Sequence, residues 1–296
     1  LPTEHRPITH HTITPYCAWH SPISAALLLA DAVRLSQPSI VIEEDSEAVY
    51  WVESRPQEGG RGVVVRWSAG VAQDVIPPGY SAHNRVHEYG GGDYVVHKGV
   101  VYFVNDADQR VYRAAPGQTP TPLTPATTPA GALRYADFIV DAARARLICV
   151  REDHRATGHE AINTLVAVPL AGGEAVVLAA GADFYAAPRL SPDGRRLAWL
   201  SWNHPNMPWD GTELWLADVD ADSTLLNTRR VAGGPAEAIF QPEWSPDGRL
   251  TFISDRSDWW NLYRLSRDVP LERLEDGPER LEDGPERLED GPERLE

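Results

Sequence analysis

The sequence is poor in the features that mark secreted, membrane-bound and nucleic-acid-binding proteins. Its 296 residues include two cysteines, Cys17 and Cys149, which cannot build a disulfide framework. Acidic residues outnumber lysine plus arginine by 43 to 27, and the formal charge of −16 argues against a surface for nucleic acid or anionic lipid. The longest apolar run, 25–30, is far too short to span a bilayer, and no signal peptide is visible. We therefore expect a cytoplasmic protein with no nucleic-acid partner and no membrane partner.

The sequence also lacks the common motifs of enzyme chemistry. The nucleophile elbow of α/β-hydrolases needs Gly-x-Ser-x-Gly on a turn before a helix. The nearest match, Gly79-Tyr80-Ser81-Ala82-His83, has histidine in place of the second glycine and no helix after it. No glycine-rich phosphate loop precedes a helix, no cysteine pair has zinc spacing, and the ten histidines are scattered. The sequence therefore predicts no catalytic residue, no metal site and no cofactor.

The body of the sequence contains a repeat. Short apolar runs that favour β-strands begin at residues 49, 101, 147, 197 and 250, so their spacings are 52, 46, 50 and 53. Each is followed by a second β-rich stretch, and two repeats share the turn signature Ser-Pro-Asp-Gly-Arg, at 191–195 and 245–249. A unit of several short strands at this period is typical of one blade of a β-propeller. The sequence predicts an all-β fold, a β-propeller with about five blades.

Three regions are expected along the chain. Residues 1–39 form a polar leader and a short helix, because Ser21-Pro22 offers an N-cap and a proline at the first helical position. Residues 40–265 form a partial propeller. Residues 266–296 form a low-complexity tail, in which Arg-Leu-Glu-Asp-Gly-Pro-Glu runs three times from Arg273 and Gly-Pro breaks any helix once per unit. We interpret the tail as solvated, and an artefact of the gene end is favoured over a functional interaction tail.

A first candidate functional segment is His87-Glu88-Tyr89-Gly90-Gly91-Gly92. Three consecutive glycines predict positive φ angles or a very close backbone approach. In one interpretation the glycines pack against the next blade, and His87 and Glu88 form structural hydrogen bonds. In the other, His87, Glu88 and Tyr89 lie at the central channel and touch a ligand or a partner domain.

A second candidate segment, 202–211, holds Trp202, His204 and Trp209 in a loop that two prolines and Asp-Gly predict. Exposed loop aromatics can anchor a partner, and the alternative is that they fold back over the blade. Trp259-Trp260 has the same two interpretations, with burial between blades favoured. The charged run 151–155 is interpreted as a solvated loop.

These segments resemble the N-terminal β-propeller of the prolyl oligopeptidase family of serine peptidases, in its acylaminoacyl-peptidase and dipeptidyl-aminopeptidase-like branch. The resemblance spans about residues 16–264 and rests on long strings rich in Trp and His, at 87–92, 201–215 and 254–263. It implies a propeller, usually of seven blades, joined to a C-terminal α/β-hydrolase domain that carries a Ser, Asp and His triad. The family's triad maps onto no residue of this sequence, so we expect a chain truncated before that domain and inactive alone.

Two classes of function follow. In the first, the chain is the propeller module of a serine-type oligopeptidase or aminopeptidase, which gates and orients short peptides for its partner, the α/β-hydrolase domain. In the second, it is a free-standing β-propeller that binds a peptide or a protein through loop aromatics. In both, the candidates for contact with substrate or with a second domain are His87, Glu88, Tyr89, Trp202, His204 and Trp209.

Overall fold

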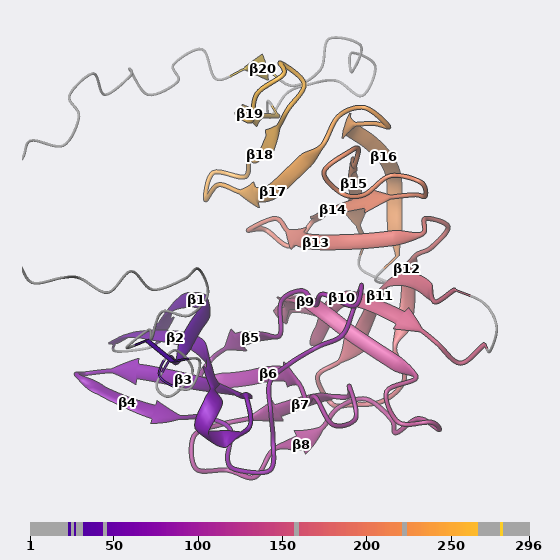
Figure 1. The fold of residues 1–296 in the computed structure, drawn as a ribbon. Coiled ribbons are helices and arrows are strands. Elements are labelled where there is room, and N and C mark those ends of the chain that lie inside the picture. The colour runs from indigo at the N-terminus through magenta and orange to yellow at the C-terminus, as the bar shows by residue number, and fades with distance from the viewer. Residues whose placement is uncertain are drawn as a thin grey trace, which may run out of the picture.

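The computed structural model describes residues 23–24, 27, 32–43, 46–156, 160–220, 224–265 and 279–280. Within them the chain forms five antiparallel sheets of four strands, and in each sheet the strands that are consecutive in sequence pair with one another. The sheets follow one another around an arc, from the indigo first sheet to the yellow fifth sheet (Figure 1). The predicted all-β propeller with five blades is confirmed.

Each blade takes its four strands from one stretch of sequence. The first contains β1 (Arg34–Glu43), β2 (Ser46–Arg55), β3 (Arg61–Ser68) and β4 (Val71–Asp74). The second contains β5 (Tyr94–His97), β6 (Val100–Val104), β7 (Val111–Ala114) and β8 (Thr121–Pro122), and the third contains β9 (Leu133–Asp141), β10 (Arg146–Asp153), β11 (Ile162–Pro169) and β12 (Val176–Ala179). The fourth contains β13 (Phe184–Leu190), β14 (Arg196–Trp202), β15 (Glu213–Val219) and β16 (Leu225–Gly233), and the fifth contains β17 (Ile239–Trp244), β18 (Leu250–Ser254), β19 (Asn261–Arg264) and β20 (Glu279–Arg280). Two short 3₁₀ helices, η1 (Pro56–Glu58) and η2 (Ala142–Arg144), lie in connections.

The repeated apolar runs are the second strands of the blades, β2, β6, β10, β14 and β18. Because successive side chains of a strand point to opposite faces of its sheet, such a run packs against two neighbours at once. In β10, Leu147 and Cys149 pack in a cluster with the second blade, while Ile148 and Val150 pack in a cluster with the fourth. The core is therefore a series of apolar layers between blades. A strand that is buried on both faces carries apolar side chains at successive positions and does not alternate between apolar and polar residues.

The outward faces of the first and fifth blades are apolar but lack such a neighbour among the described residues. Ile40 and Ile42 of β1 are 72% and 74% exposed, and Phe240 of β17 is 58% exposed. The inward faces of the same two blades are buried against the second and fourth blades. Because side chains point to both faces of every sheet, the first and fifth blades expose apolar surface on the face that has no described neighbour.

Polar side chains on the first strands connect neighbouring blades. Asp137 of β9, itself in the left-handed region at φ 56°, accepts the Gly92 N–H at 2.6 Å and the Ala187 N–H at 3.1 Å. A Cβ atom on Gly91 would lie 2.9 Å from the Asp137 carboxylate, so side chains are excluded where the second and third blades meet. The interpretation in which these glycines pack against the next blade is confirmed.

The two ends of the chain fall largely outside the described residues. The helix predicted at 21–30 lies there except for isolated positions, and so does most of the repeat tail. The described part of the tail is β20, which pairs antiparallel with β19. At the other end the first strand begins at Arg34, ahead of the boundary expected at residue 40. No described helix has the length and apolar character needed to cross a membrane.

Candidate functional site on the loop face

The connections between strands emerge on two opposite faces of the propeller. Because the strands of each blade alternate in direction, the connection from the second to the third strand and the connection to the next blade share one face. We call this the loop face, and it includes the connections 75–93, 180–183, 203–212, 234–238 and 255–260. The two Ser-Pro-Asp-Gly-Arg turns join first to second strands, so they lie on the opposite face. Five of the six candidate residues predicted from the sequence lie in these connections, and the sixth, Trp202, ends β14 directly before one of them.

Four of the six meet in one aromatic cluster. His87 and Tyr89, from the connection before the second blade, join Trp202 and His204, from the fourth blade, around Phe184. The His87 ring lies 5.3 Å from the Trp202 ring and 5.6 Å from the Tyr89 ring, measured between centroids. Phe184 stacks on Trp202 at 5.2 Å and lies 4.9 Å from His204. A lone aromatic residue at the start of a strand carries no signal in the sequence, which is why Phe184 was not a candidate.

The members of the aromatic cluster differ in exposure. Trp202 is 4% exposed, so it folds back over the blade, whereas Tyr89 is 63% exposed. Tyr89 therefore presents a ring to any molecule that approaches the loop face, and Trp202 supports the cluster from behind.

His87 is held in an unusual backbone conformation. His87 and Glu88 both lie in the left-handed region, at φ 56° and 62°, which is costly for residues other than glycine and is often retained at functional sites. The His87 N–H donates to the Glu152 carboxylate at 2.7 Å, while Nε2 of the ring is buried without a hydrogen-bond partner among the described residues. Burial lowers the pKa of His87, against the opposing effect of the Glu152 and Asp137 carboxylates. Burial therefore favours the neutral form of the ring.

Glu152 is the buried centre of a charged group beneath the cluster. Its second oxygen lies 3.0 Å from His154 Nε2 and 3.8 Å from Arg134, and Arg134 also forms an ion pair with the exposed Glu88 at 2.6 Å. The hydrogen bond from Arg134 lowers the pKa of Glu88. The expectation that residues 151–155 form a solvated loop is wrong, because Arg151–Asp153 belong to β10 and Glu152 is only 4% exposed. A run of charges does not reveal which of its members turns inward.

His204 is oriented by a carboxylate at the edge of the aromatic cluster. One oxygen of Asp183 accepts the His204 N–H at 2.9 Å and lies 3.0 Å from Nδ1 of the same residue. These two contacts lower the pKa of Asp183. They direct the other ring nitrogen of His204 away from Asp183.

Trp209 does not join the aromatic cluster. With Pro208, Phe240 and Trp260 it lines a separate apolar groove of about 450 Å³ beside the fifth blade. Trp209 is 62% exposed. The expected burial of Trp259-Trp260 between blades is wrong, because Trp259 is 77% exposed and Trp260 is 54% exposed. The loop face therefore carries two aromatic regions, one at the aromatic cluster and one at this groove.

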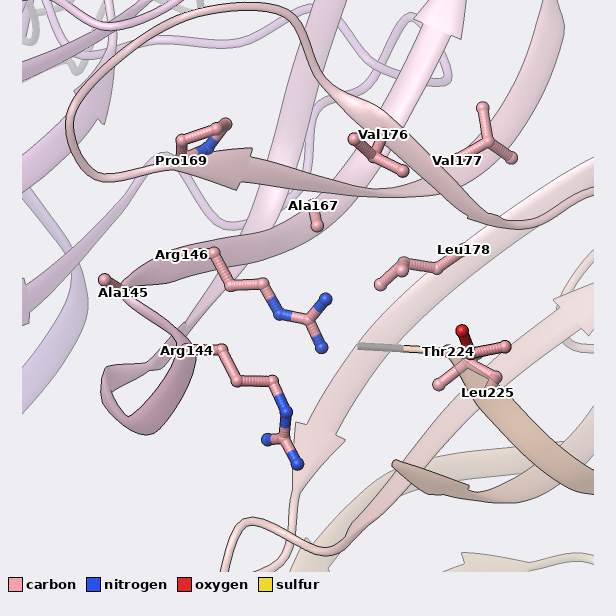
Figure 2. Close-up of a pocket in the computed structure, with 10 residues that line it drawn as sticks. All are labelled: Arg144, Ala145, Arg146, Ala167, Pro169, Val176, Val177, Leu178, Thr224 and Leu225. Atoms are coloured by element: carbon pink, nitrogen blue, oxygen red, sulfur yellow. The ribbon is translucent and has the colours of Figure 1, made fainter. Parts of the chain in front are cut away.

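Two other features have structural roles. Ser81, from the partial elbow motif, accepts the Gly62 N–H at 3.0 Å, which ties the first blade to the connection after it. A cavity of about 410 Å³ between the third and fourth blades is lined by Arg144 and Arg146, whose side chains extend side by side (Figure 2). Both guanidinium groups bind the buried Asp141.

Within the described part of the chain, no group of three or more His, Cys, Asp or Glu residues could hold a metal ion.

The environment of His87 gives a measurable expectation. We expect its pKa, followed by NMR of the ring protons, to lie below the ordinary value of about 6.5. The unfolded chain then binds this proton at higher pH than the folded chain, so the stability contribution is complete above about pH 6.5 and decreases as the pH falls below it. The Tyr89→Ala variant opens the ring to water and should move the pKa of His87 upward. A wild-type pKa at or above 6.5 would contradict the buried, neutral ring.

Comparison with known proteins identifies the propeller. No protein-family model and no curated protein sequence matches the chain. Among solved structures, the puromycin-hydrolyzing peptidase of Mycobacterium tuberculosis superposes with a TM-score of 0.80 at 37% identity, over 92% of this chain and 42% of its own. A puromycin hydrolase gives a TM-score of 0.78 at 37% identity with the same coverage, and prolyl oligopeptidase B of Galerina marginata shares the fold, with a TM-score of 0.56 at 11% identity over 84% of this chain and 37% of its own.

The chain is homologous to the propeller region of prolyl oligopeptidase-family peptidases. The resemblance to the family's propeller, inferred from the strings rich in Trp and His, is thereby confirmed, and its acylaminoacyl-peptidase and dipeptidyl-aminopeptidase-like branch stays a prediction. This prolyl oligopeptidase-family propeller spans less than half the length of the two puromycin-hydrolysing relatives. Its described blades carry the loop face and the aromatic cluster.

Proposed function

We propose that this chain is the gating propeller of a serine-type oligopeptidase or aminopeptidase, with its loop face covering an α/β-hydrolase domain that performs the chemistry. The observation that carries the proposal is the placement of all six candidate residues in, or directly beside, the connections of one face. A face rich in exposed aromatic and charged side chains suits contact with a second domain and with peptides.

The serine of the partial elbow motif and the described cysteine are both poorly placed to act as nucleophiles. Ser81 is engaged by Gly62, and Cys149 is fully buried in the layer between the second and third blades. Burial raises the pKa of the Cys149 thiol, and the thiolate is the reactive form of cysteine. The role that remains is positional, because a wall over an active site restricts entry and orients a short peptide before the reaction.

The similarity to puromycin-hydrolysing peptidases supports the same type of substrate. The identity of 37–39% extends over 86–92% of this chain, so the loop face of those proteins is built on the same blades. We propose that the complete protein hydrolyses an amide bond that follows an amino acid, as an aminopeptidase or acylaminoacyl-peptidase does. The compartment proposed for it is the cytoplasm.

The test compares this chain with a chimera. Residues 32–265 replace the matching segment of the Mycobacterium tuberculosis peptidase, and turnover is measured on aminoacyl and acyl-aminoacyl p-nitroanilides. We expect turnover by the chimera and none by this chain alone. In the chimera, Tyr89→Ala should raise KM, while the control Trp67→Ala, at an exposed aromatic of β3, should leave KM unchanged.

Two results would contradict the proposal. Turnover by the purified chain alone, surviving removal of contaminants, would show a nucleophile within it. A folded chimera without activity, together with capture of a stable partner that is not a hydrolase domain, would favour the free-standing binding propeller.

A further inference from the structure

A cavity of about 630 Å³ opens on the loop face between the first and second blades. Its walls are the start of β1, with Arg34, and the connection from Ser81 to Asp93, together with Asp106. Tyr89 also lines it, so the cavity and the aromatic cluster share one exposed ring. The volume lies within the range of small-molecule sites and suits a peptide of two or three residues.

The acidic groups of this cavity are already satisfied. The buried Asp93 accepts hydrogen bonds from the Asn84 N–H at 2.8 Å, the Asn84 side chain at 2.6 Å and the Gln37 side chain at 2.5 Å. Asp106 lies 2.9 Å from Arg85 and 3.1 Å from His83 Nδ1. Neither carboxylate is left to attract a cation.

Arg34 differs from every other charged group in the cavity. Its side chain is exposed and has no hydrogen bond or ion pair with any described residue. Arg34 and Arg85 line the cavity together with Asp93 and Asp106. Asp106 pairs with Arg85 and Asp93 is buried, so Arg34 is the exposed charge of this cavity that no described carboxylate neutralises. A concave polar site with a free guanidinium group is built for an anion, and the planar guanidinium fork matches a carboxylate.

We propose that this cavity binds the C-terminal carboxylate of a short peptide through Arg34, with the last side chain of the peptide against Tyr89. The assignment rests on the proposed gating function and narrows its substrates to short peptides with a free carboxyl end. Arg34 acts in binding and not in bond cleavage.

The test is a pair of titrations on the full chain. Isothermal titration calorimetry compares the tripeptide Ala-Ala-Phe as the free acid with its C-terminal amide. We expect the free acid to bind at least about tenfold more tightly, because a charge-assisted hydrogen bond is lost in the amide. The Arg34→Gln variant should bind the acid as weakly as the amide, and Arg34→Lys should restore part of the difference.

The control is Arg113→Gln, which removes the same charge from an exposed position on β7 outside the cavity and should keep the tenfold preference. Equal affinities for acid and amide, or an unchanged preference in Arg34→Gln, would overturn the assignment. Competition by acetate as effective as that of the tripeptide would also overturn it, because the site would then recognise any carboxylate. These titrations need no hydrolase domain, so their failure is distinguishable from failure of the chimera.

Discussion

Replacing Asp141 with alanine is expected to lower the free energy of unfolding by about 3–5 kcal/mol, because the change removes a fully buried carboxylate from the two arginines that it pairs with. Asp141 is fully buried and accepts hydrogen bonds from Arg146 Nε at 2.9 Å and Arg144 Nη1 at 3.1 Å. Arg144 continues into the fourth blade, where it donates to the Val219 carbonyl at 3.1 Å and the Asp220 carbonyl at 3.0 Å. Asp141 thus supports a connection between two blades as well as an ion pair.

The matched control is Asp74→Ala. Asp74 also binds an arginine, Arg55, at 2.7 Å, but this carboxylate lies at the surface, where an ion pair contributes less than about 1 kcal/mol. Urea denaturation followed by tryptophan fluorescence gives both values. Equal losses in the two variants would show that burial of Asp141 does not determine its contribution.

Replacing Phe103 with alanine should cost a similar amount, about 3–5 kcal/mol, through the cavity it leaves. Phe103 is fully buried in the layer between the first and second blades, with ring centroids 5.9 Å from Tyr112 and 6.3 Å from Tyr80. The midpoint of urea denaturation should fall while the slope stays constant, since the surface exposed on unfolding is nearly unchanged.

Two variants control for the loss of an aromatic ring. Phe103→Leu keeps most of the buried volume and should cost about 1 kcal/mol. Trp259→Ala removes a larger ring from a position that is 77% exposed and should stay within about 0.5 kcal/mol of the wild type. A large loss in Trp259→Ala would mean that this tryptophan is buried in solution, as its sequence first suggested.

The blades could be predicted from the sequence because their cause is local. A strand buried on both faces must be apolar at every position, so runs such as Leu147–Val150 are visible without knowledge of their neighbours. Gly91 and Gly92 are equally informative, since their close approach to Asp137 leaves little room for a side chain. In both cases a single structural requirement, burial on both faces or a close approach of the backbone, selects one kind of residue.

The candidate site could be predicted only in part. His87, Tyr89, Trp202 and His204 were identifiable as unusual residues. Their meeting in one cluster depends on contact between the connection that precedes the second blade and the fourth blade. Trp209 belongs to the same loop as His204 but lies at another groove. Residues of one loop are close in sequence, but the direction in which each side chain points depends on the surface against which the loop packs.

By itself, the sequence determined the repeat, the identity of the second strands and the absence of a recognisable nucleophile elbow, because these follow from hydrophobic period and from motif chemistry. Only the tertiary structure decided which charges are free. Glu152 and Arg34 are both ordinary charged residues in the sequence, but Glu152 is buried under His87, while Arg34 faces a cavity and pairs with no residue that the structure describes. Burial and pairing arise from contacts between distant segments, and no local pattern encodes them.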